Sequence, residues 1–159
     1  MEEKNTEGAF RWIVGLLRKH SIPFRIAGGF AASIYGSARP IADIDIGIPD
    51  DRFDDLYEDV KEYVTFGPAQ YLDREWDLKL MTLMYRGQEI DIDGATTSKF
   101  FDRDTNTWIV GTRDLSIHEM REVYGILVPV IPKAALIAYK KKLGRSVDIQ
   151  DVEALESQQ

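Results

Sequence analysis

Hydrophobic residues in the first third of the chain recur with two different periods. Between residues 6 and 20 they fall at the helical spacing i, i+3, i+4, i+7, namely at Phe10, Ile13, Val14 and Leu17. This spacing is typical of a helix with one buried face. Segment 43–48, Asp-Ile-Asp-Ile-Gly-Ile, alternates strictly instead. A period of two predicts a strand with one apolar face, so Asp43 and Asp45 should point to the same side.

A glycine pair lies between these two patterns. Residues 24–27 read as a short strand, and residues 30–35 as a short helix closed by Gly36. Gly28 and Gly29 join the two elements, and their missing side chains would let the backbone approach a phosphate at the start of the helix. A tight left-handed connection explains the same glycines without any ligand.

The remaining pattern alternates between predicted strands and helices. Segments 78–85 and 88–93 flank Arg86-Gly87, a two-residue spacing that fits a β-hairpin. Stretch 95–116 is rich in Thr, Asp and Arg and shows no clear period. The other predicted elements are a strand at 124–131 and helices at 53–60, 133–143 and 146–156. This order predicts an α/β (α+β) fold, with a mixed β-sheet, flanking helices and C-terminal helices.

Composition narrows the possible chemistry. The chain has 159 residues, 20 Lys+Arg against 27 Asp+Glu, and a formal charge of −7. We expect a single domain over residues 1–159, with a C-terminal helical segment at about 132–156. The absence of cysteine excludes disulfides, thiolate zinc sites and a cysteine nucleophile. With only two histidines, a metal site would need oxygen ligands.

The distribution of charge predicts where the protein works. Apolar runs are only a few residues long, whereas a membrane-spanning helix needs roughly 20. The start, Met1-Glu2-Glu3-Lys4, carries acid where a secretory signal carries base. We therefore expect a cytoplasmic protein outside the membrane, and the sequence does not indicate its oligomeric state. Net acidity disfavours non-specific binding to nucleic acid, so such a substrate would need a local basic patch.

Acidic residues on two predicted strands form the main chemical signal. Asp43 and Asp45 share one strand face, and Glu89, Asp91 and Asp93 share a face of another. If the two strands are neighbours, several carboxylates converge and repel one another, a cost that Mg²⁺ or Mn²⁺ would offset. The alternative is a pair of edge strands whose acids simply face solvent.

Three short motifs together resemble a known family. Ile26-Ala27-Gly28-Gly29, Gly36-Ser37-Ala38-Arg39 and Asp43-Ile44-Asp45-Ile46 resemble the signature of the nucleotidyltransferase superfamily with the DNA polymerase β-type fold. The third carboxylate of that family looks like Asp91, with Asp93 as the competing assignment. The tail also looks like the C-terminal helical segment of small bacterial and archaeal members, through Leu136, Lys140, Arg145, Asp148 and Asp151.

The resemblance implies a metal-dependent transfer from a nucleoside triphosphate such as ATP. Asp43, Asp45 and Asp91 would be the catalytic residues and would hold two Mg²⁺ ions, while an acceptor hydroxyl attacks the α-phosphate and pyrophosphate leaves. Asp91 would also be the base that takes the hydroxyl proton. The residues implied at the nucleotide are Gly28, Gly29, Ser37, Arg39 and Lys140.

Two of these nucleotide contacts have a structural alternative. Arg39 is a candidate phosphate clamp, because its guanidinium can bind two oxygens at once, or it pairs with Asp43 or Asp45. Lys140 belongs to a run of three lysines that ends a predicted helix, where positive charge complements the helix dipole.

The acceptor is not identified and could be a small molecule, an RNA end or a protein. Relatives with the Gly-x-x-Arg element often carry Thr two residues after the Arg, where this chain has Ile41. An alternative is therefore a nucleotide- and metal-binding module without turnover, acting through a protein partner, for example in a toxin–antitoxin pair. A third possibility is an acidic structural domain with neither property.

Overall fold

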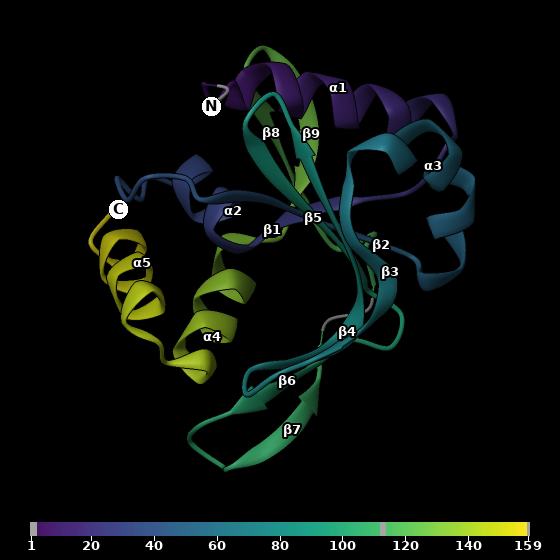
Figure 1. The fold of residues 1–159 in the computed structure, drawn as a ribbon. Coiled ribbons are helices and arrows are strands. Elements are labelled where there is room, and N and C mark those ends of the chain that lie inside the picture. Colours follow the sequence, from purple (N-terminus) through teal and green to yellow (C-terminus); the bar gives the residue numbers. More distant parts are fainter. Residues whose placement is uncertain (1–2, 112–113, 159) are drawn as a thin grey trace.

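A mixed β-sheet with helices on both sides organises the chain (Figure 1). The computed structural model describes residues 3–111 and 114–158, so Met1, Glu2 and part of stretch 95–116 lie outside it. The sheet has nine strands in the described part: β1 (Arg25–Ala27), β2 (Asp43–Ile48), β3 (Val64–Leu72), β4 (Trp76–Tyr85), β5 (Gln88–Gly94), β6 (Lys99–Asp102), β7 (Thr107–Val110), β8 (Glu119–Val123) and β9 (Ile126–Val130). The helices are α1 (Thr6–Lys19), α2 (Gly28–Ile34), α3 (Phe53–Val60), α4 (Lys133–Leu143) and α5 (Ser146–Glu156).

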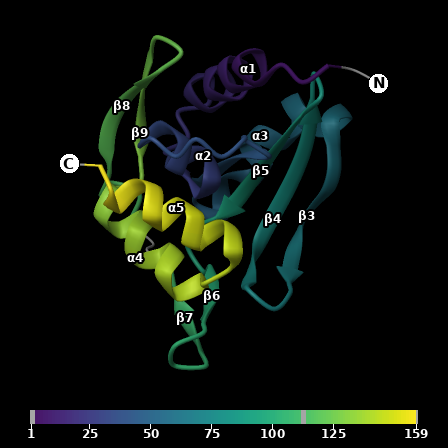
Figure 2. The same cartoon turned by 90° about the vertical axis from the view of Figure 1, so that its left-hand side faces the viewer.

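Strands β2 and β5 lie side by side in the middle of the sheet. They run parallel, and the strand order is β7-β6-β4-β5-β2-β1-β9-β8, with β3 paired to β4. The isoleucines of both strands are fully buried in a core that includes α1 and α3 residues. The alternation predicted from the sequence is therefore confirmed. The acidic residues of these strands line one pocket together with Tyr139 and Lys140 of α4. Figures 1 and 2 show where α4 and α5 lie beside the sheet.

Most predicted elements are present, with shifted ends. Helix α2 begins at Gly28 rather than Phe30, because Gly28 takes a φ of +61° and turns the chain directly from β1 into the helix. Strand β9 begins at Ile126 rather than Tyr124, because Tyr124 and Gly125 have positive φ and form the turn of a hairpin with β8. Helix α4 ends at a left-handed Gly144, as predicted.

The sequence prediction lacks strands β3, β6, β7 and β8, and the first three of these share a weak local signal. Strand β3 contains Gly67-Pro68 and two register irregularities against β4, so its side chains do not alternate cleanly between buried and exposed. Strands β6 and β7 are four residues each and fall inside the stretch that shows no period. They pair with each other, and β6 also pairs with β4, but neither strand buries a continuous apolar face.

Helices in the described ranges are too short or too polar to cross a lipid bilayer.

Candidate functional site

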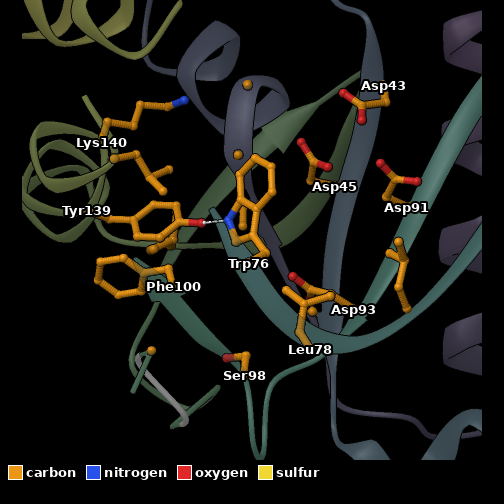
Figure 3. Close-up of a pocket in the computed structure, with 18 of the residues that line it drawn as sticks. Asp43, Asp45, Trp76, Leu78, Asp91, Asp93, Ser98, Phe100, Tyr139 and Lys140 are labelled. Atoms are coloured by element: carbon orange, nitrogen blue, oxygen red, sulfur yellow. Dashed lines mark hydrogen bonds between the residues drawn. The ribbon is translucent and has the colours of Figure 1, made fainter. Parts of the chain in front are cut away.

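The register of β2 on β5 brings the acidic residues together. Asp45 lies opposite Asp91 and Asp43 lies opposite Glu89 in the parallel pair. Because the strands are in register, their acidic faces coincide on one side of the sheet. Asp43, Asp45 and Asp91 each offer an oxygen, and these oxygens all lie within 4.8 Å of one another (Figure 3). The convergence expected if the strands were neighbours is thus confirmed.

Asp93 belongs to the same strand face but lies one step further along. It is opposite Gly47 rather than an aspartate, and the positive charge that acts on it is that of Arg25. Arg25 itself donates to the carbonyl oxygen of Ile117 at 2.9 Å. The compact group of carboxylates therefore contains Asp91 and not Asp93.

The carboxylate cluster is electrostatically unfavourable by itself. Burial, and then a hydrogen bond and charge from Asp43, raise the pKa of Asp91 to about 8. Burial, followed by the charges of Asp43 and Asp91, raises the pKa of Asp45 well above its ordinary value. Burial likewise raises the pKa of Asp93 to about 7, against the opposing charge of Arg25. The charged forms of these carboxylates are thus disfavoured in the folded protein, and a bound cation would reduce that cost.

Thr82 is a site residue that the sequence reasoning missed. Its hydroxyl donates to Asp91 Oδ1 at 2.8 Å, and it lies directly opposite Asp91 in the β4–β5 hairpin. The signal was present, because counting pairs outward from the Arg86-Gly87 turn places residue 82 opposite residue 91. This hydrogen bond holds one oxygen of a carboxylate that lines the pocket.

The glycine pair lies against the acidic cluster. A side chain at Gly28 would place its Cβ 2.1 Å from Asp45 Oδ2, and a Cβ at Gly29 would lie 2.9 Å from Arg39 Nη2. Both positions line the same pocket as the carboxylates. Glycine is therefore required at Gly28 for close approach to Asp45 as well as for its positive φ.

The pocket extends from the carboxylates to an aromatic wall (Figure 3). Its volume is about 600 Å³. Trp76 donates its indole N–H to Tyr139 Oη at 2.6 Å, and the Tyr139 ring packs edge-on against Phe100. Trp76 thus lines the pocket, whereas Trp108 is 42% exposed on β7.

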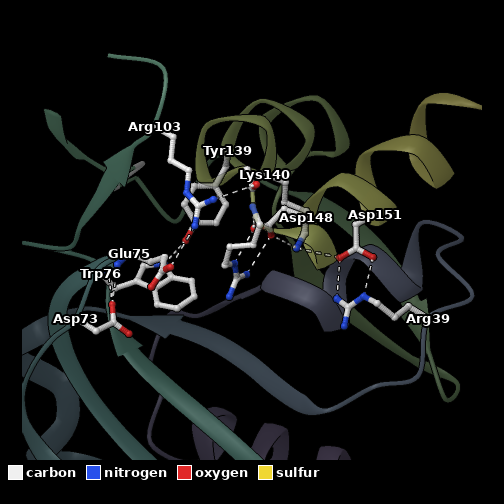
Figure 4. Close-up of polar contacts among 11 residues, drawn as sticks. Arg39, Asp73, Glu75, Trp76, Arg103, Tyr139, Lys140, Asp148 and Asp151 are labelled. Carbon is white, nitrogen blue, oxygen red and sulfur yellow. Dashed lines mark hydrogen bonds and ion pairs between the residues drawn. The ribbon is translucent and has the colours of Figure 1, made fainter. Parts of the chain in front are cut away.

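Arg39 binds a carboxylate that the sequence reasoning did not consider. Its Nε and Nη2 donate to the two oxygens of Asp151 at 3.1 and 2.8 Å (Figure 4). Asp43 or Asp45 had been considered as its ion-pair partner, and the structure corrects this to Asp151 on α5. Arg39 nevertheless lines the pocket. Ser37 does not line it, and its hydroxyl donates to Asp151 Oδ1 at 2.8 Å.

Lys140 lies between two buried carboxylates. Its Nζ is 3.0 Å from Asp151 Oδ2 and 3.3 Å from Asp148 Oδ1, and its side chain is 2% exposed. Asp148 also accepts two hydrogen bonds from the guanidinium of Arg145, which in turn stacks on Trp76. Lys140 also lines the pocket, and its positive charge lowers the pKa of Asp45 against the larger effect of burial.

The donor set fits a divalent cation. Three carboxylates with hard oxygen donors lie together, the chain offers no thiolate, and the raised pKa values show that the cluster lacks compensating positive charge. Mg²⁺ is usually bound by one or two such carboxylates together with water and substrate phosphates. Asp43, Asp45 and Asp91 could therefore hold Mg²⁺ or Mn²⁺.

Ile41 is partly buried and packs against the hydrophobic core. It also lines the pocket, so the position at which relatives often carry Thr faces the site here with an apolar side chain.

Comparisons with known proteins give structural but not sequence matches. No protein-family model and no curated protein matches the sequence. A Thermotoga maritima protein assigned provisionally as a nucleotidyltransferase superposes with a TM-score of 0.74 at 17% identity, over 100% of this chain and 97% of that one. The lincosamide antibiotic adenylyltransferase LnuA, bound to lincomycin, superposes with a TM-score of 0.64 at 14% identity, over 98% and 99%.

A third solved structure is similar over most of its length. ANT(2")-Ia, in complex with adenylyl-2"-tobramycin, superposes with a TM-score of 0.61 at 13% identity, over 94% of this chain and 87% of that one. These similarities show that the chain has the nucleotidyltransferase fold, a mixed sheet in the α+β class, as the sequence motifs implied.

Proposed function

We propose that this chain, which has the nucleotidyltransferase fold, is a metal-dependent nucleotidyltransferase. It moves a nucleoside monophosphate from a nucleoside triphosphate to an acceptor hydroxyl and releases pyrophosphate. The single observation that carries the proposal is the group of Asp43, Asp45 and Asp91, with oxygens within 4.8 Å of one another, in the pocket of this fold. ATP is the proposed donor, since one of the similar structures is an adenylyltransferase and another holds an adenylylated tobramycin.

The three carboxylates would hold Mg²⁺ or Mn²⁺. Bound there, the metal would supply positive charge that neutralises the phosphate oxygens and the departing pyrophosphate. Without the metal, the three carboxylates would repel the triphosphate, because they are the charges nearest to the reacting phosphate and all of them are negative.

Proton transfer is assigned to Asp91. As the acceptor oxygen bonds to the α-phosphorus, the bond from that phosphorus to the β-phosphate bridging oxygen breaks, and the hydroxyl proton passes to the Asp91 carboxylate. Thr82 donates to Oδ1 of Asp91 at 2.8 Å, which would fix the orientation of the carboxylate that takes the proton.

The β- and γ-phosphates are assigned to the part of the pocket that is formed by the glycine pair and Arg39. Gly28 and Gly29 would present backbone close to the β- and γ-phosphates, and Arg39 would donate to their oxygens. Ser37 does not line the pocket and would act through Asp151, to which it donates. Lys140 lines the pocket and pairs with Asp151, so it would add positive charge at the phosphates.

A small molecule is the acceptor that the pocket supports best. Its volume of about 600 Å³ lies within the range of small-molecule sites, which are typically concave and lined by apolar and aromatic groups. Trp76 and Phe100 supply such a wall here. The similar structures hold lincomycin and adenylyl-2"-tobramycin. An RNA end is less compatible with the net charge of −7, and a protein acceptor is less compatible with a pocket of this volume.

Transfer of label tests the proposal. Purified protein is incubated with ATP labelled at the α-phosphate, Mg²⁺ and a cell extract separated into small-molecule, RNA and protein fractions. We expect label in the small-molecule fraction, lost in Asp43→Asn and kept in Asp54→Asn, an exposed aspartate on α3. Label in the RNA or protein fraction would keep the transferase and reject the small-molecule acceptor.

The binding module without turnover is the second candidate function. It is favoured by Ile41, whose apolar side chain lines the pocket where relatives often carry a hydroxyl. Tight binding of Mn²⁺ and ATP by calorimetry, with no label transferred to any fraction, would support the module. Absence of binding would contradict both functions.

A further inference from the structure

We infer that Asp151, a buried carboxylate of α5, is a positioning residue that fixes Arg39 for contact with the phosphates of the bound nucleotide. This inference rests on the proposed function, because it assigns a role to a residue that supports the same pocket. Asp151 lies on a different element from the three clustered carboxylates, and its side chain has no exposed surface.

The loop that needs positioning joins α2 to β2. Residues 37–42 of this loop form no helix or strand, yet Arg39 and Ile41 line the pocket and the loop leads directly into Asp43. Backbone hydrogen bonds of a sheet or helix do not hold such a segment, so its geometry depends on side-chain contacts.

Helix α5 supplies those contacts. Asp151 accepts from Ser37 Oγ at 2.8 Å and from Arg39 Nε and Nη2 at 3.1 and 2.8 Å. Beyond the end of α5, Gln158 Nε2 donates to the carbonyl oxygen of Gly36 at 3.1 Å. These contacts join residues more than a hundred positions apart, so the C-terminal helix fixes the first half of the loop. The second half is held by Lys4 and Gln88, which donate to the carbonyl oxygens of Ile41 and Ala42.

The charge of Asp151 is permanent under working conditions. Burial by itself would raise its pKa, but hydrogen bonds from Arg39, Lys140 and Ser37 outweigh burial and lower the pKa to about 2. A buried carboxylate that loses its hydrogen-bond donors destabilises the folded state strongly. Arg39 is therefore held in one orientation and not merely attracted to a mobile surface charge.

This orientation leaves part of the guanidinium available. Nε and Nη2 donate to Asp151. Nη2 also lies close to Gly29, since a Cβ added at Gly29 would be 2.9 Å from this nitrogen. The third nitrogen of Arg39 points away from Asp151 (Figure 4). A guanidinium has five N–H donors, so one edge can bind the carboxylate while the rest bind phosphate oxygens.

A double-mutant cycle tests whether Asp151 acts through Arg39. Calorimetry measures the affinity for ATP in the presence of Mn²⁺, and separately for Mn²⁺ alone. In the wild-type background we expect Asp151→Asn to weaken ATP binding by about tenfold and to leave binding of Mn²⁺ alone unchanged. In an Arg39→Ala background the same substitution should change ATP affinity by less than about twofold, because the residue through which it acts is gone.

The matched control is Glu153→Gln, a loss of charge at an exposed carboxylate on the same helix, which should leave ATP affinity unchanged. Arg39→Lys keeps the charge without the two-pronged contact and should also weaken ATP binding several-fold; it replaces Asp151→Asn if that variant does not fold. Equal effects of Asp151→Asn with and without Arg39, or wild-type affinity in Arg39→Lys, would overturn the inference alone. Failure of the wild-type protein to bind ATP with Mn²⁺ would overturn the proposed function as well.

Discussion

At the scale of single residues, the site depends on how closely backbone and carboxylate approach each other. Gly28 combines a φ of +61° with a position at which a Cβ would lie 2.1 Å from Asp45 Oδ2. No other residue type satisfies both conditions without moving Asp45. The glycine motif is thus explained by its contact with the acidic cluster, in addition to any contact with phosphate.

Replacing this glycine should separate backbone strain from damage to the site. We expect Gly28→Ala to be destabilised by more than about 1–2 kcal/mol, the cost of left-handed backbone in alanine, and to lose the rise in melting temperature that Mn²⁺ causes. Gly125→Ala is the matched control, because Gly125 has a φ of +79° with nothing within 4 Å of its added Cβ. It should show the strain alone and keep the full response to Mn²⁺. An equal response to Mn²⁺ in both variants, measured by thermal unfolding, would contradict this account.

At the scale of elements, α4 and α5 are joined to each other and to the loop before β2 by buried charges. Lys140 on α4 is shared between Asp148 and Asp151 on α5, and all three side chains are at most 2% exposed. Buried charges stabilise a structure only as long as each keeps its partners. The two helices therefore act as one support for the phosphate end of the pocket.

Removal of the shared lysine should weaken this support strongly. Lys140→Met leaves Asp148 and Asp151 with fewer donors, and we expect a loss of about 3 kcal/mol in the free energy of unfolding. The neighbouring Lys141 pairs with Glu156 at the surface, where the two side chains are 53% and 51% exposed. Lys141→Met should cost less than about 1 kcal/mol. Urea denaturation measures both, and similar losses would show that the buried network is not what holds the helices.

At the scale of the whole molecule, the acidic face makes stability depend on pH. The pKa values of Asp91 and Asp93 are raised to about 8 and about 7, and that of Asp45 is also raised. Their charged forms are disfavoured in the folded state, so the folded protein keeps protons that the unfolded chain has released. Stability therefore falls as the pH rises from the ordinary carboxyl range to about 8.

This dependence should become smaller when metal binds. In the presence of a chelator, we expect the free energy of unfolding to decrease steadily from about pH 5 to about pH 8. With saturating Mg²⁺ the part of the decrease that comes from Asp45 and Asp91 should be removed, because the cation binds the deprotonated carboxylates of the folded state only. The part that comes from Asp93, which lies outside the cluster, should remain. Denaturation curves across this range, with and without Mg²⁺, measure the effect. A metal-free protein that becomes more stable with rising pH would show that the carboxylates do not repel one another as the structure indicates.

The sequence by itself determined the local properties of the site. Alternation of aspartate and isoleucine set which face of β2 and β5 is acidic, and the Arg86-Gly87 turn set the register that places Thr82 opposite Asp91. Periodicity and turn geometry act over a few residues, so they can be read along the chain. The glycine and aspartate motifs also implied the fold that the similar structures show.

Only the tertiary structure decided which distant residues meet. The parallel pairing of β2 with β5 selects Asp91 over Asp93, and the packing of α5 gives Arg39 its partner Asp151 instead of Asp43 or Asp45. The sequence prediction also lacked strands β3, β6, β7 and β8. Such contacts depend on how whole elements pack, and no pattern within a short segment records which other segment will lie beside it.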